Sequence, residues 1–534
     1  MSSVCLSRVH RKSLVRGFFR ALAVTTAVVS ASAAVQAADK DTLTAAFAAE
    51  AQVMDPTKFT AGVDPQFASQ MFEQLVRYGP DRKPINWLAE SWKLETVDGK
   101  PVIDVTLRKG VKFHNGDPLT SADFEFAFER FRDPKLSRYA HLQANVEKFE
   151  VVDDLNFKLH FKQADGAYIA DSLQLWALPK KYMQEVGDEQ FQKAPVGTGP
   201  WKFVSRELRK ELRLTAFEDY WNKEQRPQIK NLVIKIIPED LTRIAAFKSG
   251  EVDWVENIPP AMVAEFKAMK GIQTFTAPSG NNVYLDFPTE NPDSPFSKLK
   301  VRQALAHAID TDAIIKSVLF GQGQRYVEVG EGTTGYDPNL KPYSYDPKLA
   351  RQLLAEAGYP KGFEVPCYGL NTPREPNIKE MGEATFAYLS QVGIRCQVRG
   401  LEYGAWVEMR RRPPTGPSPM QGIIVALWSH NIPGDPTTPW AGHLHSFKEK
   451  TGWGTYSYTA DAKADAMVEE LKNTMDPEKR DALAREIAKY KRDNVLGGLS
   501  TYRPIITFAW KDNVNFTPWP APGNWRAFQQ VSFK

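Results

Sequence analysis

The chain has 534 residues, more than one hydrophobic core usually holds, which indicates two or three domains. Hydrophobic residues make up 42% and charged residues 25%, ordinary proportions for a globular protein. The formal net charge is +4, and it becomes −1 once the five basic residues of positions 1–37 are removed. That balance excludes a nucleic-acid partner from our expectations, because phosphate binding needs a clustered basic face, and the one tight run, Arg410–Arg412, is typical of a solvated loop.

Residues 1–37 have the pattern of a secretory signal. A basic start without acids precedes an apolar run from Ala21 to Ala34, and small residues up to Ala37 suit signal peptidase. The apolar run is short for a membrane span, and Cys5 precedes it, so no lipid anchor is expected. We therefore expect cleavage after Ala37 and a mature protein in the periplasm of a Gram-negative cell.

The first part of the mature chain predicts a lobe that carries an inserted subdomain. Residues 41–47 suit a strand, and a helix with one apolar side is expected over Pro65–Leu75. Short strand-like runs fill 84–176, which indicates an inserted α+β subdomain.

The stretch from Leu107 to Phe131 passes from strand through turns to helix. Thr120 is placed to cap the helix, and Asp123 stands three residues on, where its carboxylate completes a capping box. His114 lies in the turns, and we expect it to be a hydrogen-bonded turn residue rather than a base.

Two strand–helix–strand units follow, over 232–255 and 363–399, and both imply parallel pairing with a crossover helix. A second lobe is expected to begin at Asn281. Asp476 and Pro477 open the last long helix, and the final strand, 505–510, is expected to cross back into the first lobe.

Catalytic and nucleotide motifs are missing from the sequence. Gly197–Pro200 lacks the Gly-Lys-Ser/Thr of a phosphate loop, and Gly330–Gly335 fits GxGxxG without a helix after it. No HExxH, GxSxG or kinase-like set occurs. We therefore expect no enzyme activity and no cofactor, with a secreted hydrolase as the rival from another class.

Two pairs of residues suggest covalent or metal chemistry. Cys367 and Cys396 lie in strand-like segments of an exported protein, and either a disulfide or two buried thiols fits them. His443 and His445 form an HxH pair without a third ligand in place, so they are the alternative candidates for metal binding while the main expectation is no metal site.

The stretch Trp428–Pro436 is the candidate ligand loop. It lies at the carboxyl end of a strand, where open α/β sheets bind ligands, and it presents Trp428, His430, Asn431 and Asp435 together. An ordinary Asp-Pro turn is the alternative interpretation.

Several motifs in fixed order resemble the extracellular solute-binding proteins of family 5, the dipeptide- and oligopeptide-type binding proteins of bacterial ABC importers. The motifs are Trp92, Leu107–Gly116, Leu119–Asp123, Tyr220-Trp221, Val301–Leu305, Tyr345–Pro347, Leu353–Pro360 and Asp435-Pro436. The resemblance implies an α/β fold of the two-lobed periplasmic binding protein type (type II), with an α+β subdomain inserted in the first lobe. It also implies capture of a ligand by hinge closure and transfer to an inner-membrane permease.

Peptide-binding members of that family hold the peptide's α-ammonium with an Asp in this loop. The chain departs from the pattern, because His430 and Asn431 stand near that position and a neutral pair holds an ammonium less firmly than a carboxylate does. Further candidate ligand contacts are Arg374 and Lys379 after strand 363–368, the aromatic residues Tyr284, Trp406 and Trp428, and Glu50, Ala51 and Gln52 from the first lobe. Core packing is the alternative for the aromatic residues, and a structural role is the alternative for Asp435.

The sequence thus predicts a monomeric binding protein of an ABC importer for peptides or peptide-like solutes. The alternative ligand in the same role is a metal chelate, an opine or an oligosaccharide. The predicted boundaries are 1–37 for the signal peptide, 38–82, 190–276 and 500–534 for the first lobe, 83–189 for the inserted subdomain and 277–499 for the second lobe.

Overall fold

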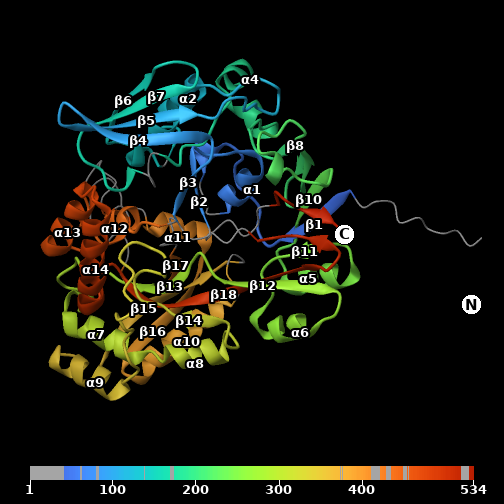
Figure 1. Ribbon diagram of the computed structural model, residues 1–534. Helices are drawn as coiled ribbons and strands as arrows, with labels where there is room; N and C mark the ends of the chain where they lie inside the picture. The colour runs from blue at the N-terminus through green and yellow to red at the C-terminus, as the bar shows by residue number, and fades with distance from the viewer. Residues whose placement is uncertain are drawn as a thin grey trace, which may run out of the picture. The chain divides into compact units, whose positions relative to one another are not determined.

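A computed structural model describes residues 41–534 apart from 60–62, 80–82, 138, 169–172, 373–374, 376, 411–420, 429–433, 449–453, 455, 457 and 519–527 (Figure 1). The predicted signal peptide lies outside these residues. In the part of the chain that is described, no helix combines the length and the apolar character that a membrane crossing needs.

A sheet of 12 strands runs through the described chain, and β18 (Leu499–Lys511) joins its two halves. The first half-sheet contains β1 (Thr42–Phe47), β8 (Trp201–Glu207), β9 (Glu211–Ala216), β10 (Asn231–Ile236), β11 (Trp254–Val255) and β12 (Ile272–Pro278). The second half-sheet contains β13 (Asn282–Asp286), β14 (Gly323–Arg325), β15 (Phe363–Asn371), β16 (Ile394–Glu402) and β17 (Ile423–Trp428). β18 pairs first with β13 and then with β11 and β12, so the final strand crosses from the second half-sheet to the first and is longer than expected.

Parallel pairing comes from the two predicted strand–helix–strand units. β10 and β11 lie on either side of β1 and run parallel to it, and α5 (Asp240–Ser249) connects them. β15 and β16 are parallel neighbours, with α10 (Ile378–Gln391) between them in the chain. The other helices of the two halves are α6 (Val263–Ala268), α7 (Leu299–Ala308), α8 (Thr311–Ser317), α9 (Pro347–Glu356), α11 (Tyr403–Arg410), α12 (Thr437–His443), α13 (Ala462–Asn473) and α14 (Pro477–Asn494).

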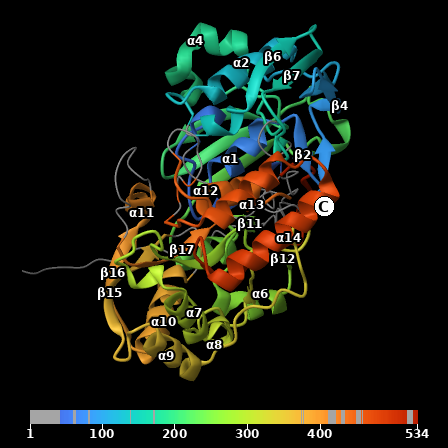
Figure 2. The same cartoon turned by 90° about the vertical axis from the view of Figure 1, so that its left-hand side faces the viewer.

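The inserted subdomain is a separate antiparallel sheet with helices on it (Figures 1 and 2). Its strands are β4 (Ala89–Val97), β5 (Lys100–Leu107), β7 (Asn156–Phe161) and β6 (Val146–Val151), and its helices include α2 (Ser121–Arg132) and α4 (Lys180–Lys193). The capping box of α2 is confirmed, since the Thr120 N–H donates to Asp123 Oδ2 at 2.9 Å. Phe124 and Phe128 of α2 are fully buried against aromatic residues of the sheet, which stabilises the subdomain by about 1.5–3 kcal/mol for each ring.

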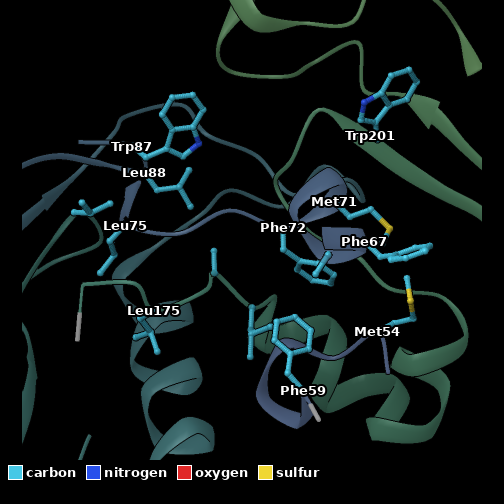
Figure 3. Packing of buried hydrophobic residues seen from close by; sticks show 14 of the residues in the cluster. Met54, Phe59, Phe67, Met71, Phe72, Leu75, Trp87, Leu88, Leu175 and Trp201 are labelled. Atoms are coloured by element: carbon cyan, nitrogen blue, oxygen red, sulfur yellow. The ribbon is translucent and has the colours of Figure 1, made fainter. Parts of the chain in front are cut away.

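The helix α1 (Asp64–Met71) is shorter than the sequence suggested. The prediction that it reaches Leu75 is wrong, because Phe72 already has extended backbone angles and the chain then enters β2 (Val76–Tyr78), which pairs with β3 (Pro84–Asn86). The apolar side was nevertheless identified, since Figure 3 shows Phe67, Met71 and Phe72 among the buried side chains of this core.

Buried polar residues join the subdomain to the first half-sheet. Nε2 of His114 donates to the Gly199 carbonyl at 2.9 Å, and Nδ1 accepts from the Gly197 N–H at 3.2 Å, so His114 is the hydrogen-bonded turn residue that was predicted. Burial lowers the pKa of His114 from 6.5 to about 3. Glu73 accepts from Trp87 Nε1 at 2.7 Å and from the Tyr220 hydroxyl at 2.8 Å, and burial raises the pKa of its carboxyl group.

Candidate functional site

Both half-sheets direct the carboxyl ends of their parallel strands toward the middle of β18. At the end of the first half-sheet, Val255 pairs with Ala509, and the Ile258 N–H donates to the Thr507 carbonyl at 2.9 Å. In the second half-sheet, Val283 pairs with Tyr502, and β17, antiparallel to β13, ends beside the start of β13. Two such edges meeting at a crossing strand form the place where open α/β sheets bind ligands.

Buried charges hold the loops at the first edge in place. The guanidinium of Arg243 donates to the carbonyls of Ile237, Pro238, Glu256 and Asn257 at 2.9–3.1 Å, so one side chain ties the ends of β10 and β11 together. The Glu256 carboxylate accepts from the Ala48 N–H at 2.7 Å, which fixes the end of β1 to the end of β11.

The predicted candidates of the first lobe lie on this edge and have partners within it. Glu50 Oε2 accepts from the Arg209 N–H at 2.6 Å, and Oε1 lies 3.4 Å from Arg206. Arg206 also donates to the Ala51 carbonyl, and the Gln52 N–H donates to Asp64 Oδ1 at 2.7 Å. These contacts give the loop after β1 a fixed position next to the turn between β8 and β9.

The second edge brings together the start of β13 and the ends of β15 and β17. Ser279 Oγ and Asn281 Nδ2 donate to Glu375 Oε2 at 2.8 and 3.3 Å, so the segment that crosses from β12 to β13 is bound to the loop after β15. Trp428 ends β17 at this edge, opposite Asn282. Arg374, His430 and Asn431 lie outside the described residues.

Asn282 is a further candidate at this edge, and it is not among the residues predicted from the sequence. It is 1% exposed, and among the described residues neither the nitrogen nor the oxygen of its carboxamide has a hydrogen-bond partner. An unpaired buried amide costs roughly 1–3 kcal/mol, so the place of Asn282 at the strand edge makes it a candidate ligand contact. The sequence feature that could have identified it is a polar residue at the start of β13, a strand that is buried at every position.

Asp435 is held inside the protein. Its Oδ1 accepts from the Thr437 N–H at 2.8 Å, and its Oδ2 pairs with Arg480, whose side chain is 6% exposed. The Asp-Pro turn therefore uses this carboxylate to fix the entry into α12.

Tyr284 and Trp406 pack in the core of the second half. Tyr284 is 2% exposed, with its ring 6.3 Å from that of His443, and Trp406 is 3% exposed, with its ring 5.4 Å from that of Tyr403. Lys379 lies 3.9 Å from Glu383 on the exposed side of α10. These three residues therefore have neighbours that account for them without a ligand.

His443 and His445 contact different neighbours. His443 packs between Tyr284 and Tyr456, whereas His445 Nε2 lies 3.2 Å from Glu469 Oε1. Among the described residues, no group of three or more His, Cys, Asp or Glu side chains is arranged to hold a metal ion.

The cysteines form a disulfide between the neighbouring strands β15 and β16. The Cys367 and Cys396 Cα atoms are 5.2 Å apart, and the two sulfur atoms are bonded. Of the two alternatives that the sequence left open, the structure contains the disulfide.

Known proteins match both the sequence and the fold. The family model of bacterial extracellular solute-binding proteins, family 5 Middle, matches residues 83–447. Heme-binding protein A of Haemophilus influenzae is 31% identical over 399 residues, which cover 68% of this chain and 70% of that protein. Di/tripeptide-binding protein 1 of Pseudomonas aeruginosa is 28% identical over 485 residues, which cover 84% and 88%.

Solved structures share the whole architecture. The PBP AgaA from A. tumefaciens R10, in complex with agropinic acid, has a TM-score of 0.77 at 25% identity and covers 92% of this chain and 99% of that one. The match confirms the predicted mixed α/β binding-protein fold with an added antiparallel subdomain.

Proposed function

The chain belongs to the bacterial extracellular solute-binding proteins of family 5, and from this premise we propose that it captures peptides or peptide-like solutes between its two lobes and delivers them to an ABC permease. Members of this family bind solutes without catalysis, so the hydrolase alternative is withdrawn. We further propose that the protein acts as a monomer in the periplasm, with the lobe boundaries predicted from its sequence.

Asn282 is the observation that carries the peptide proposal. Its carboxamide offers a donor and an acceptor side by side, which is the complement of a peptide group. Main-chain contacts of this kind supply affinity without reading side chains, while bridging waters adapt to different side chains. A di- or tripeptide thus satisfies the unpaired carboxamide, and the two strand edges enclose the rest of the ligand.

A second candidate is a metal chelate or an opine in the same transport role. The observation that favours it is the pair His430 and Asn431 near the position where peptide binders hold the ammonium with an acid. Relatives differ in their ligands, since one is named for heme and another was solved with agropinic acid.

Native mass spectrometry of the chain from residue 38 onward, purified without refolding, separates these candidates. A series of co-purified short peptides supports peptide import. A single non-peptide mass keeps the transport role and replaces the substrate. A protein that is empty and takes up nothing from a mixed di- and tripeptide pool contradicts the peptide proposal, and binding of hemin or nickel-histidine then tests the second candidate.

A further inference from the structure

Arg480 connects three separate stretches of the second half. Its guanidinium donates to the carbonyls of Leu471 and Thr474 at 2.7 and 3.0 Å, which lie at the corner between α13 and α14. It also donates to Thr437 Oγ1 at 2.9 Å and pairs with Asp435. One buried side chain therefore binds both the corner between α13 and α14 and the residues that lead into α12.

The inserted subdomain docks on the same corner. The Gly166 N–H donates to the Lys472 carbonyl at 2.6 Å, and Asp165 Oδ1 lies 3.7 Å from Lys472 Nζ. Figures 1 and 2 both show α13 next to the subdomain. A Cβ atom on Gly166 would lie 1.6 Å from Arg480 Nη1 and 2.2 Å from the Thr474 carbonyl oxygen, so only glycine allows this approach.

We propose that Asp165 and Gly166, through their contacts with Lys472, lock the subdomain onto the corner that Arg480 holds, and that Arg480 is the positioning residue that fixes this corner relative to the entry into α12. The subdomain is inserted into the first lobe, while Arg480 belongs to the second. The covalent connections between the lobes run through β18 and Ser279–Asn281, which act as hinges. The lock is a separate noncovalent tie, so the lobes separate only when the Gly166–Lys472 hydrogen bond breaks. A tie that controls how the lobes open goes beyond the proposed function and acts whichever ligand the protein binds.

The test measures lobe separation in the ligand-free chain. Spin labels are placed at Val152→Cys in the subdomain, which is 52% exposed, and at the exposed Lys361→Cys in the second lobe. Double electron–electron resonance then gives the populations of short and long distances. Gly166→Ala is expected to raise the ratio of long to short distances about tenfold, the effect of one lost hydrogen bond of about 1.4 kcal/mol.

Gly400→Ala is the matched control, because a Cβ atom there meets nothing within 4 Å, and its distances should equal those of the parent chain. Lys472→Gln removes the ion pair with Asp165 and keeps the backbone hydrogen bond, so a smaller shift in the same direction is expected. If Gly166→Ala no longer unfolds cooperatively, the distances of Lys472→Gln serve as the test of the lock.

Arg480→Lys supplies a readout that packing alone does not move. Lysine keeps the pairing with Asp435 and loses the forked contacts to Leu471 and Thr474, so the open population should rise, and the thermal midpoint should fall because two carbonyls lose their donor. Unchanged distances in Gly166→Ala and Lys472→Gln overturn the lock. That result leaves the proposed function untouched, because these measurements contain no ligand.

Discussion

Replacing Asn282 by leucine should stabilise the empty protein and weaken ligand binding. The carboxamide is buried and has no hydrogen-bond partner among the described residues, and leucine has the same number and branching of side-chain heavy atoms without polar atoms to desolvate. Removing the unpaired amide is expected to gain roughly 1–3 kcal/mol, which raises the thermal midpoint of a chain of this length by about 1–3 °C. A peptide that loses both hydrogen bonds should bind about tenfold or more weakly.

Differential scanning calorimetry of the empty chain and titration calorimetry with trialanine measure the two effects. Asn281→Leu is the matched neighbour, because Asn281 donates to Glu375 at 3.3 Å and its loss should lower the midpoint. The reasoning fails if Asn282→Leu lowers the midpoint as well, since the carboxamide then has a partner in the folded chain. Unchanged affinity for trialanine would remove Asn282 from the site.

Three further predictions concern stability. Reducing the Cys367–Cys396 disulfide, whose cysteines have a sequence separation of 29, should cost about 3–4 kcal/mol in the chain-entropy model. The loss is measured as a lower thermal midpoint with dithiothreitol, which a Cys367→Ser variant does not show. Acidification from pH 6.5 to pH 3 should destabilise the protein through His114 by up to roughly 4–5 kcal/mol, because the unfolded chain takes up the proton and the native imidazole does not. Denaturant titrations should show a shallower pH dependence for His114→Gln, and an equal slope contradicts the buried neutral imidazole. Lys491→Met should lower the free energy of unfolding by about 3–5 kcal/mol, because the buried Glu328 carboxylate, 2.5 Å from Lys491 Nζ, then loses that partner. In the same denaturant titrations, adding Glu328→Gln should restore most of the lost stability.

Local features were predictable because neighbouring residues encode them. The capping box of Thr120 and Asp123 acts within one helical turn, and Asp476 with Pro477 starts α14 by the same kind of local contact. The apolar side of α1 was predicted for the same reason, whereas its end was not. Phe72 leaves the helix because tertiary packing favours an extended chain there, and no residue in the local sequence marks that change.

The order of motifs along the chain predicted the family, and the ends of the predicted strands indicated where the candidate site lies. The sequence did not predict the roles of single residues. Glu50 meets the backbone of Arg209 across a separation of 159 residues, and Asp435 meets Arg480 across 45. A carboxylate in a loop looks the same in the sequence whether it faces a ligand or a buried arginine.

Contiguous patterns in the sequence therefore predicted most of the elements, their parallel units and the class of protein. Tertiary structure decided which polar groups are already paired and which remain unpaired. Asn282 is the clearest example, because its partner in the sheet, Trp428, lies far from it in the sequence. Burial creates the cost of an unpaired group, and burial is a property of the assembled fold.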